Sequence, residues 1–593
     1  MNREKISCAI ICGGLLSLAA FFIYLPYEIG AALTIPPDSS EYAIGLSNLL
    51  EHGRFGITLN GEWYPSRYSP WFSLSCLTPA YFLSGGNVLC LHWAILVFAL
   101  VLLVVIWKMG SLCGLGRLAI LPPVLIMFIP DFLFYSRVVM TEVPYAALVA
   151  FLALLFVRFS NQVQVSIKFC LCVGLLIAWS GFVRSTGYTL IVPFGVVILF
   201  RFRMGWKKSL VSLSAMGLPI VTAQLVNMWY NWMTFGSPFR SGYHYWCAVP
   251  MDFPGLAFNL KYVVPTAVCL LRQPIIQATL VFLSAPLLFA VYLVAKRAFR
   301  EYRVFLLLMG YVGFHLLVLL ILYLGYYWID TRFFFPITIC SLLLFFVTVN
   351  SVLSIAGDKA RIFLTAVVFI MCMIIVVLSP TRYLYMTMGR PVWLAQAQIA
   401  GAVLPPGAVV IQRGDPNVLD YFGFKDKGLT LYPFCRAVDY VMRMTAPNRI
   451  THLVDTPASW HQEIIPELVD SGVCRMPFPD VFEESPEKIC KYVTEGRRVF
   501  VLQNHFLCKE SFESFNSRLE GMGLSLKIFG IWNVPNIEPN PLRHFYDRLL
   551  FPGYDMDSRP EITVIYYEIV VAEGHDTSPL GLSDIKQGEG DKK

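Results

Sequence analysis

The chain has 593 residues, of which 56% are hydrophobic and only 14% are charged, and its formal net charge is +7. A single small domain is excluded by this length, and an ordinary soluble protein by the charge content, because soluble domains carry roughly a quarter charged residues. The positive charge does not indicate a nucleic-acid partner, since short basic loops between apolar segments account for it.

Apolar runs of about 20 residues recur before residue 380, and each is long enough to cross a bilayer as a helix. The first run, Ile6 to Tyr27, is too long for a signal-peptide core, so we expect it to remain as an uncleaved membrane helix. We predict eleven transmembrane helices, at residues 7–27, 87–107, 118–134, 143–157, 168–183, 187–200, 209–229, 274–295, 304–324, 333–352 and 362–379.

The loops on one side of these segments are short and basic, which is typical of cytoplasmic loops. With the N-terminus in the cytoplasm, eleven helices place the C-terminal region outside. The outer loops are long at 28–86 and 230–273 and combine acids with arginines, so the polar chemistry is expected on the outer face. The basic residues of the inner loops are Arg3, Lys5, Lys108, Arg117, Arg158, Lys168, Arg201, Arg203, Lys207, Lys208, Lys296, Arg297, Arg300, Arg303, Lys359 and Arg361.

After Pro380 the composition becomes that of a soluble domain. Strand-like and helical runs alternate, which predicts a small α/β domain with a largely parallel sheet at 381–573, followed by a disordered polar tail at 574–593. No GxGxxG or Walker pattern follows the first strand, so nucleotide binding is unsupported. The predicted strands are 408–412, 429–432, 450–454, 498–502, 524–531 and 562–569, with helices near 437–444, 462–471 and 509–522.

The first outer loop contains Asp38-Ser-Ser-Glu41, and a helix is predicted to begin there. Apolar residues recur at helical spacing as far as Leu50, and Gly53 ends the segment, which indicates a helix lying on the membrane surface. Two interpretations of Asp38 stay open. Asp-x-x-Glu is a capping box, and a carboxylate at the start of a helix is also placed to remove the proton from an acceptor hydroxyl.

Further along the outer loops, single charged residues stand among apolar and aromatic ones. Arg67 is suited to a lipid phosphate, because a guanidinium group matches phosphate oxygens, or equally to lipid headgroups. Glu142 begins a membrane helix, where the helix dipole also favours a carboxylate. Arg184 lies between two apolar runs and has no acidic neighbour in sequence. An unpaired arginine that close to the membrane interior indicates a functional role.

The last two outer loops add three polar candidates. His244 lies in Gly-Tyr-His-Tyr, and Asp330 and Arg332 lie in an aromatic cluster before Pro336. Asp330 and Arg332 are two residues apart, so a simple interfacial ion pair is the alternative to a role in binding substrate. Each motif is weak alone, but their occurrence in order on one face predicts a site there.

The chain resembles the GT-C superfamily of membrane glycosyltransferases, in the branch with protein O-mannosyltransferases and lipid A aminoarabinose transferases. The resemblance covers about residues 1–350 and implies a GT-C-like transmembrane catalytic domain at 1–380. It rests on Asp38-Ser-Ser-Glu41-Tyr42 with Gly53, Tyr68-Ser-Pro70-Trp71, Met140-Thr-Glu142-Val-Pro144-Tyr145, Arg184-Ser-Thr-Gly187, Phe235-Gly-Ser-Pro238 and Asp330-Thr-Arg332-Phe-Phe-Phe-Pro336.

The resemblance implies transfer of a monosaccharide from a polyprenyl-phosphate donor, with an acid of the first outer loop as the base. That acid corresponds to Asp38. We predict Asp38 and Glu142 as catalytic residues, and Arg184, Arg67 and Arg332 as ligands of the donor phosphate, which leaves during transfer.

The resemblance also concerns a cofactor and the residues that support the site. The resemblance leaves a divalent metal open, with Glu142 joining Asp38 around it and His244 completing the site. Many members have two adjacent acids where this chain has Asp38 and Ser39, so Glu41 is assigned a supporting or acceptor-binding role together with His244 and Asp330.

The expected partners are membrane lipids, the lipid-linked donor and a glycan, lipid or protein acceptor. No Asn-x-Ser/Thr acceptor site occurs in the sequence, which favours a bacterial inner membrane over the eukaryotic secretory route. The alternatives are a ligase that uses a lipid-diphosphate donor and a secondary transporter. A transporter is disfavoured because no internal repeat and little mid-membrane charge are present.

Overall fold

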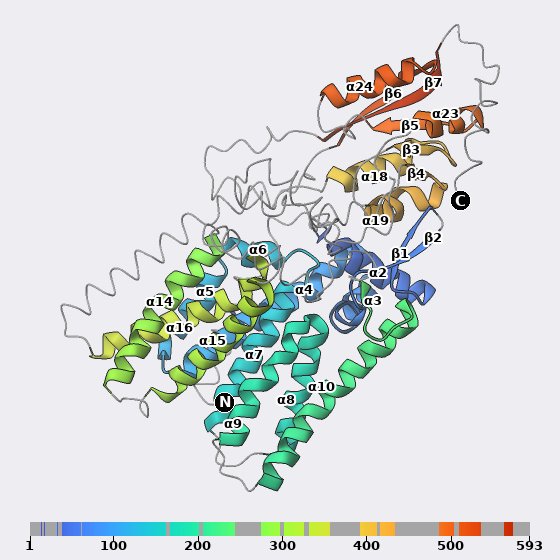
Figure 1. The fold of residues 1–593 in the computed structure, drawn as a ribbon. Helices are drawn as coiled ribbons and strands as arrows, with labels where there is room; N and C mark the ends of the chain where they lie inside the picture. Colours follow the sequence, from blue (N-terminus) through green and yellow to red (C-terminus); the bar gives the residue numbers. More distant parts are fainter. Residues whose placement is uncertain are drawn as a thin grey trace, which may run out of the picture.

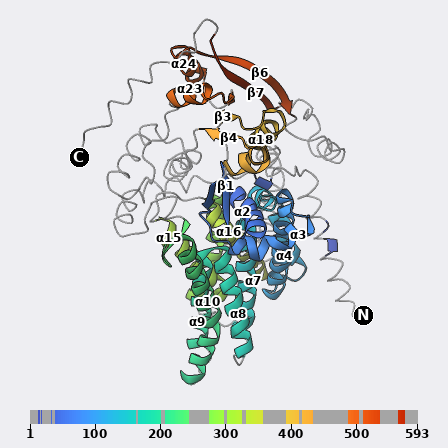
Figure 2. The ribbon, with the colours of Figure 1, turned by 90° about the vertical axis from the view of Figure 1, so that its right-hand side faces the viewer.

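The computed structural model describes residues 13–14, 17, 32–33, 38–60, 62–161, 166–200, 206–242, 274–296, 302–324, 331–355, 392–411, 416–432, 486–502, 509–534 and 562–572. These residues form a bundle of apolar helices and a unit containing a five-stranded sheet, which lies at one end of the bundle (Figures 1 and 2). The predicted segment 362–379 and most of 7–27 lie outside the described residues.

Apolar helices occupy most of the predicted membrane segments that the structure describes. Within the described ranges, four helices are long and apolar enough to cross a membrane: Val88–Leu112, Glu142–Ser160, Trp206–Phe235 and Arg332–Ile355. The chain is therefore treated as a membrane protein. The helices of the bundle are α4 (His92–Leu112), α7 (Glu142–Asn161), α8 (Ile167–Val183), α9 (Ile191–Phe200), α10 (Trp206–Phe235), α14 (Pro274–Ala295), α15 (Arg303–Leu324) and α16 (Phe335–Ile355).

The predicted segment 118–134 is not one helix, and that expectation was wrong. It is divided among a 3-10 turn, η4 (Gly116–Ile120), and two short helices, α5 (Leu121–Ile126) and α6 (Pro130–Tyr135). Ile129 has an extended backbone with ψ 122°. Proline disfavours the helical conformation of the residue before it and has no N–H to donate, so Pro130 starts a new helix instead of continuing the old one.

Helix α8 packs closely against α10 because one glycine allows it. A Cβ added to Gly174 would lie 2.2 Å from the backbone oxygen of Met216, so only the absence of a side chain permits this approach. Small residues are typical of such close helix contacts in membrane proteins. The outer faces of these helices carry exposed apolar residues, including Leu175, Leu218 and Leu225, as expected of surfaces that face lipid.

The sheet of the tail unit has the strand order β4-β3-β5-β7-β6. Strands β4, β3 and β5 are parallel, whereas β7 is antiparallel to both β5 and β6. Four of the five described strands, β4, β3, β5 and β6, therefore run in one direction, in line with the expected largely parallel sheet. The exception is β7, which inserts between β5 and β6 and runs opposite to both, so the sheet is mixed. The strands are β3 (Val409–Ile411), β4 (Thr430–Tyr432), β5 (Val499–Leu502), β6 (Leu524–Val534) and β7 (Ile562–Val571).

These five strands lie where the sequence pattern predicts strands, and α24 lies at the predicted helix 509–522. The predicted strand 450–454 and the helices near 437–444 and 462–471 lie outside the described residues. Phe515 and Leu519 of α24 bury their side chains against Val499 and Val501 of the sheet. The helical segments of the tail unit are α18 (Val392–Val403), α19 (Pro416–Leu419), the π-helix η7 (Asp420–Phe424), the 3-10 turn η8 (Lys425–Lys427), α23 (Pro486–Thr494) and α24 (Lys509–Glu520).

The tail unit rests on helix α2 (Asp38–His52), which lies at the end of the bundle (Figure 2). The Ser47 hydroxyl lies 3.3 Å from the hydroxyl of Tyr421 in η7 and donates a hydrogen bond to Glu51. The Tyr81 hydroxyl donates to the same carboxylate over 2.6 Å and lowers the pKa of Glu51 below its usual value. This polar cluster joins the tail unit to the helix that begins with Asp38.

Candidate active site

Helix α2 begins at Asp38 and ends at His52, directly before Gly53, as the sequence predicts. Asp38 and Glu41 lie in its first turn, where the N-terminal end of the helix dipole favours negative charge. The Gly53 N–H donates to the Leu49 carbonyl, and its φ of +71° is a conformation that glycine adopts without strain. The helix is buried from Asp38 to Asn48, so protein encloses most of its length. Its position on the membrane surface stays a prediction.

A β-hairpin after α2 carries Ser66 and Arg67 back to the start of that helix. Its strands are β1 (Gly56–Leu59) and β2 (Glu62–Pro65), and Asn60 has a positive φ of 51° at the turn. Our sequence analysis missed this hairpin, although Asn-Gly at 60–61 between two short strands is a strong hairpin signal. Two further short helical segments follow: η2 (Ser73–Leu77) with α3 (Thr78–Leu83), and η3 (Val88–Leu91).

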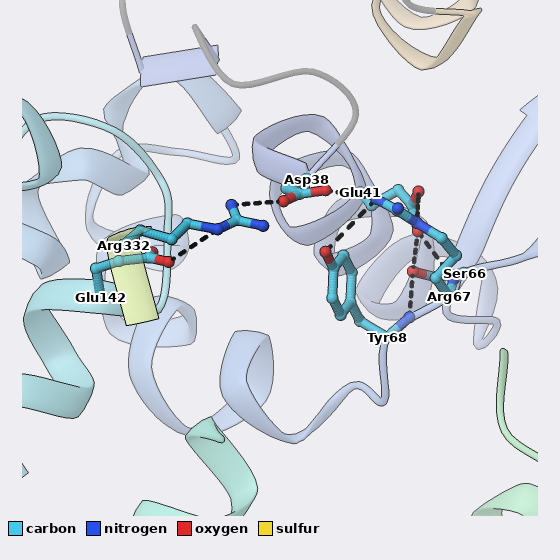
Figure 3. Close-up of polar contacts among 7 residues, drawn as sticks. All are labelled: Asp38, Glu41, Ser66, Arg67, Tyr68, Glu142 and Arg332. Carbon is cyan, nitrogen blue, oxygen red and sulfur yellow. Dashed lines mark hydrogen bonds and ion pairs between the residues drawn. The ribbon is translucent and has the colours of Figure 1, made fainter. Parts of the chain in front are cut away.

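Arg67 is held between the two acids of α2 (Figure 3). Its Nη2 lies 2.5 Å from Asp38 Oδ1, and its Nε donates to Glu41 Oε1 over 3.1 Å. Glu41 Oε2 also accepts bonds from the Ser66 hydroxyl and the Arg67 backbone N–H. Glu41 therefore fixes the Ser66–Arg67 segment against α2, and the Arg67 side chain is only 2% exposed.

Arg332 lies on the opposite side of Asp38 and links it to Glu142 (Figure 3). Its Nη1 is 2.7 Å from Asp38 Oδ2, and its Nε is 3.6 Å from Glu142 Oε1. Arg332 belongs to η6 (Thr331–Phe334), a 3-10 turn immediately before α16. The guanidinium group thus stands between the first residues of two distant helices, α2 and α7.

Arg184 completes the arrangement from the end of α8. Its Nη2 donates to Glu142 Oε1 over 2.7 Å, and its Nε donates to the Thr141 hydroxyl over 3.0 Å. The Phe333 ring lies 4.6 Å from its guanidinium carbon, close enough for a cation–π contact. Arg184 was expected to be unpaired, but its acidic partner is 42 residues away in sequence.

The charged side chains form one alternating series: Glu41, Arg67, Asp38, Arg332, Glu142 and Arg184. It contains three carboxylates and three guanidinium groups, so their formal charges cancel. The carboxylates have no exposed side-chain surface, and the arginines are at most 12% exposed. Buried charges require such pairing, because an isolated ion loses its hydration without compensation.

The structure brings together most of the predicted site residues. Asp38, Glu142, Arg184, Arg67 and Arg332 are joined by ion pairs, and Glu41 supports them. His244 and Asp330 lie outside the described residues. Ser66 and Thr141 also belong to the site but were not predicted. The only signal in the sequence was their position, since each directly precedes a charged site residue.

Metal coordination does not fit the part of the site that is described. Within that part of the chain, no group of three or more His, Cys, Asp or Glu side chains is placed to hold a metal ion. Asp38 and Glu142 are both paired with Arg332, whose guanidinium group stands where a shared cation would be needed.

The basic ends of the bundle helices lie far from this site. Helix α7 runs from Glu142 at the site to Arg158 in its last turn, about 24 Å away at 1.5 Å per residue. Helix α8 runs back from Lys168 to the site at Arg184. Arg303, at the start of α15, donates to the Ser160 carbonyl at the same distant end. The bundle is thus polarised, with the acid–arginine series at one end and basic residues at the other.

Comparison with known proteins identifies the fold. No family model matches the sequence, and no curated protein matches it. The structure is similar to ArnT from Cupriavidus metallidurans in the apo state, with a TM-score of 0.51 and 10% identity over 95% of this chain and 98% of ArnT.

Two further solved structures are less similar. ArnT bound to undecaprenyl phosphate has a TM-score of 0.49 and 10% identity, covering 93% of this chain and 97% of that one. The Archaeoglobus fulgidus oligosaccharyltransferase, in complex with Zn and sulfate, has a TM-score of 0.45 and 12% identity, covering 70% and 62%. The likeness to apo ArnT, at 10% identity over nearly the full length of both chains, shows that the two chains share a fold.

Proposed function

We propose that this protein is a glycosyltransferase that moves a monosaccharide from a polyprenyl-phosphate donor to a hydroxyl or amine acceptor. The observation that carries this proposal is the buried series in which Arg332 stands between Asp38 and Glu142, flanked by Arg67 and Arg184. It combines a candidate base with cations for an anionic leaving group, at one end of a membrane bundle with the GT-C fold.

Asp38 is the proposed base. Transfer forms a bond from the acceptor oxygen or nitrogen to the anomeric carbon and breaks the bond from that carbon to the phosphate oxygen. The acceptor loses a proton in this step, and a carboxylate within hydrogen-bond reach is suited to take it. Asp38 is the candidate because it belongs to the series of paired acids and arginines and begins a helix fixed on several sides.

The arginines are proposed to stabilise the phosphate that leaves. A polyprenyl phosphate is anionic when released, and guanidinium groups bind phosphate oxygens through two parallel hydrogen bonds. Arg184 and Arg332 are the best placed, because both extend from segments at helix ends and both are more exposed than Arg67. Preformed cations aimed at a developing negative charge lower the barrier without reorganisation at the moment of reaction.

The site is proposed to face the extracytoplasmic side of a bacterial inner membrane. Cytoplasmic loops are enriched in Lys and Arg, and the basic ends of α7, α8 and α10 lie opposite the acid–arginine series. The tail unit would then be extracytoplasmic too, since it packs on α2 through Tyr421 and Ser47. Lipid-linked donors place the phosphate near the membrane surface, where the ends of these helices lie.

The test is sugar transfer from radiolabelled polyprenyl-phosphate monosaccharides to endogenous membrane acceptors by purified protein in lipid nanodiscs. Asp38→Asn keeps the shape of the side chain but removes the base, so transfer should fall by about 100-fold or more. Asp426→Asn is the matched control, because Asp426 is an exposed carboxylate of the tail unit. Equal transfer by folded Asp38→Asn would reject Asp38 as the base, and transfer only from diphosphate-linked donors would favour the ligase.

A further inference from the structure

The arginines proposed to bind the donor phosphate are already bound to carboxylates. Arg332 Nη1 lies 2.7 Å from Asp38 Oδ2, and Arg184 Nη2 lies 2.7 Å from Glu142 Oε1. In this state the anionic partners of the arginines come from the protein itself. A phosphate group that enters the site must therefore compete with these carboxylates for the same guanidinium groups.

The same contacts oppose the proposed chemistry of Asp38. Each of its two oxygens lies within 2.7 Å of a guanidinium nitrogen, from Arg67 on one side and Arg332 on the other. Nearby positive charge stabilises the ionised form of a carboxylate and so weakens it as a proton acceptor. Asp38 becomes a stronger base when one of the two arginines moves away.

Arg332 is better suited to move than Arg67. Arg67 is fixed by two bonds to Glu41, one through its backbone N–H and one through Nε, and its guanidinium carbon lies 5.0 Å from the Tyr68 ring. Arg332 is on a four-residue 3-10 turn, and its contact with Glu142 is long at 3.6 Å. A rotation of this side chain exchanges one anion for another without displacing a helix.

We infer that Arg332 acts as a latch that holds Asp38 in a weakly basic state until the donor phosphate takes its place as the partner of Arg332. Donor binding then comes before activation of the acceptor, and the empty site does not deprotonate acceptors. This inference rests on the proposed function and adds a positioning role for Arg332 and an order of events.

Competition between Asp38 and the donor phosphate for Arg332 predicts how a change at Asp38 affects lipid binding. Asp38→Asn, which should abolish transfer, should make polyprenyl phosphate bind more tightly, by about tenfold if one competing charge pair of about 1.4 kcal/mol is removed. Asp426→Asn is the matched control, because Asp426 is an exposed carboxylate of the tail unit outside the series of six charged residues. It should leave the affinity for polyprenyl phosphate unchanged.

The measurement is the equilibrium dissociation constant of undecaprenyl phosphate for purified protein in nanodiscs, from the quenching of intrinsic tryptophan fluorescence. The double variant Asp38→Asn/Arg332→Gln separates the latch from simple repulsion. In the Arg332→Gln background, Asp38→Asn should give little or no gain in affinity, because the remaining partner of Asp38, Arg67, is still held by Glu41. If Arg332→Gln does not fold, Arg332→Lys retains the charge but not the planar fork, and the gain should shrink there too.

The outcomes separate this inference from the proposed function. Loss of transfer in Asp38→Asn with unchanged or weaker lipid binding would overturn the latch and leave the glycosyltransferase proposal standing. An equal gain in affinity with and without Arg332 would also overturn it, since repulsion alone would explain the gain. Absence of both lipid binding and transfer in the wild-type protein would overturn both.

Discussion

The ion pair between Glu142 and Arg184 should make Glu142→Gln strongly destabilising. The two side chains meet at 2.7 Å, Glu142 is completely buried and Arg184 is 12% exposed. The amide keeps the volume of the carboxylate but removes its charge. Arg184 and Arg332 are then left as two cations that share a neutral neighbour, and neither can move into solvent without breaking other contacts.

The expected cost follows from the burial of this pair. Removing one partner of a buried ion pair typically costs about 3–5 kcal/mol, because the remaining charge is desolvated without compensation. Arg184 keeps its bond to Thr141, and Arg332 keeps its ion pair with Asp38, so the lower end of that range is expected. For a domain of about 380 residues, with an unfolding entropy of roughly 2.1 cal/mol/K per residue, about 3 kcal/mol lowers the melting temperature by roughly 4 °C.

The assay is thermal unfolding of purified protein in detergent, with Glu142→Gln, Arg184→Gln and the double variant compared in one cycle. If the pair interacts as the structure indicates, the double variant should be no less stable than Glu142→Gln alone, because the uncompensated cation is removed with its partner. Strictly additive losses would refute the reasoning. So would a loss below about 1 °C in Glu142→Gln, because exposed pairs show effects of that size.

Three further predictions concern residues away from the ion pairs. Burial raises the pKa of Asp420 to about 7, so its contribution to stability is present at low pH and lost as pH rises from about 4 to about 7. Thermal unfolding at pH 5 and pH 8 should show this loss in the wild type and a smaller one in Asp420→Asn. Gly174→Ala should destabilise by about 1–3 kcal/mol, because its Cβ would meet the Met216 carbonyl at 2.2 Å. Gly310→Ala, with no atom within 4 Å of the added Cβ, should stabilise α15 by up to about 1 kcal/mol. An equal effect of the two glycine substitutions on melting temperature would contradict the packing argument.

Patterns among residues close together in the sequence predict individual helices and their ends well. Two acids before an apolar periodicity and a glycine after it locate both ends of α2, and long apolar runs locate α4, α7 and α10. Pro130 breaks the predicted segment 118–134, a signal that was present in the sequence and underweighted. These features depend on neighbours a few residues apart, so one sequence is sufficient to find them.

Contacts between distant residues could not be predicted in the same way. Glu142 and Arg184 are 42 residues apart, and the strand order of the tail unit depends on β7 pairing with β5, about 70 residues earlier in the chain. Charge patterning predicted that acids and arginines share one face. It did not predict that Arg332 stands between Asp38 and Glu142, because that depends on how the bundle helices pack.

The position of the six charged residues favours a role in binding and chemistry over a role in stability. Replacing a buried ion pair by apolar residues of similar volume is often neutral or stabilising, so burial of these charges is a poor way to hold a bundle together. The helices of this bundle are otherwise apolar enough to pack without them. The charges are also gathered at one end of the bundle, next to the starts of α2 and α7 and the end of α8, where the proposed function requires an anionic headgroup to bind. In the empty site the acids neutralise the arginines. When a phosphate binds, the same arginines can stabilise its negative charge, as the proposed transfer with an anionic leaving group requires.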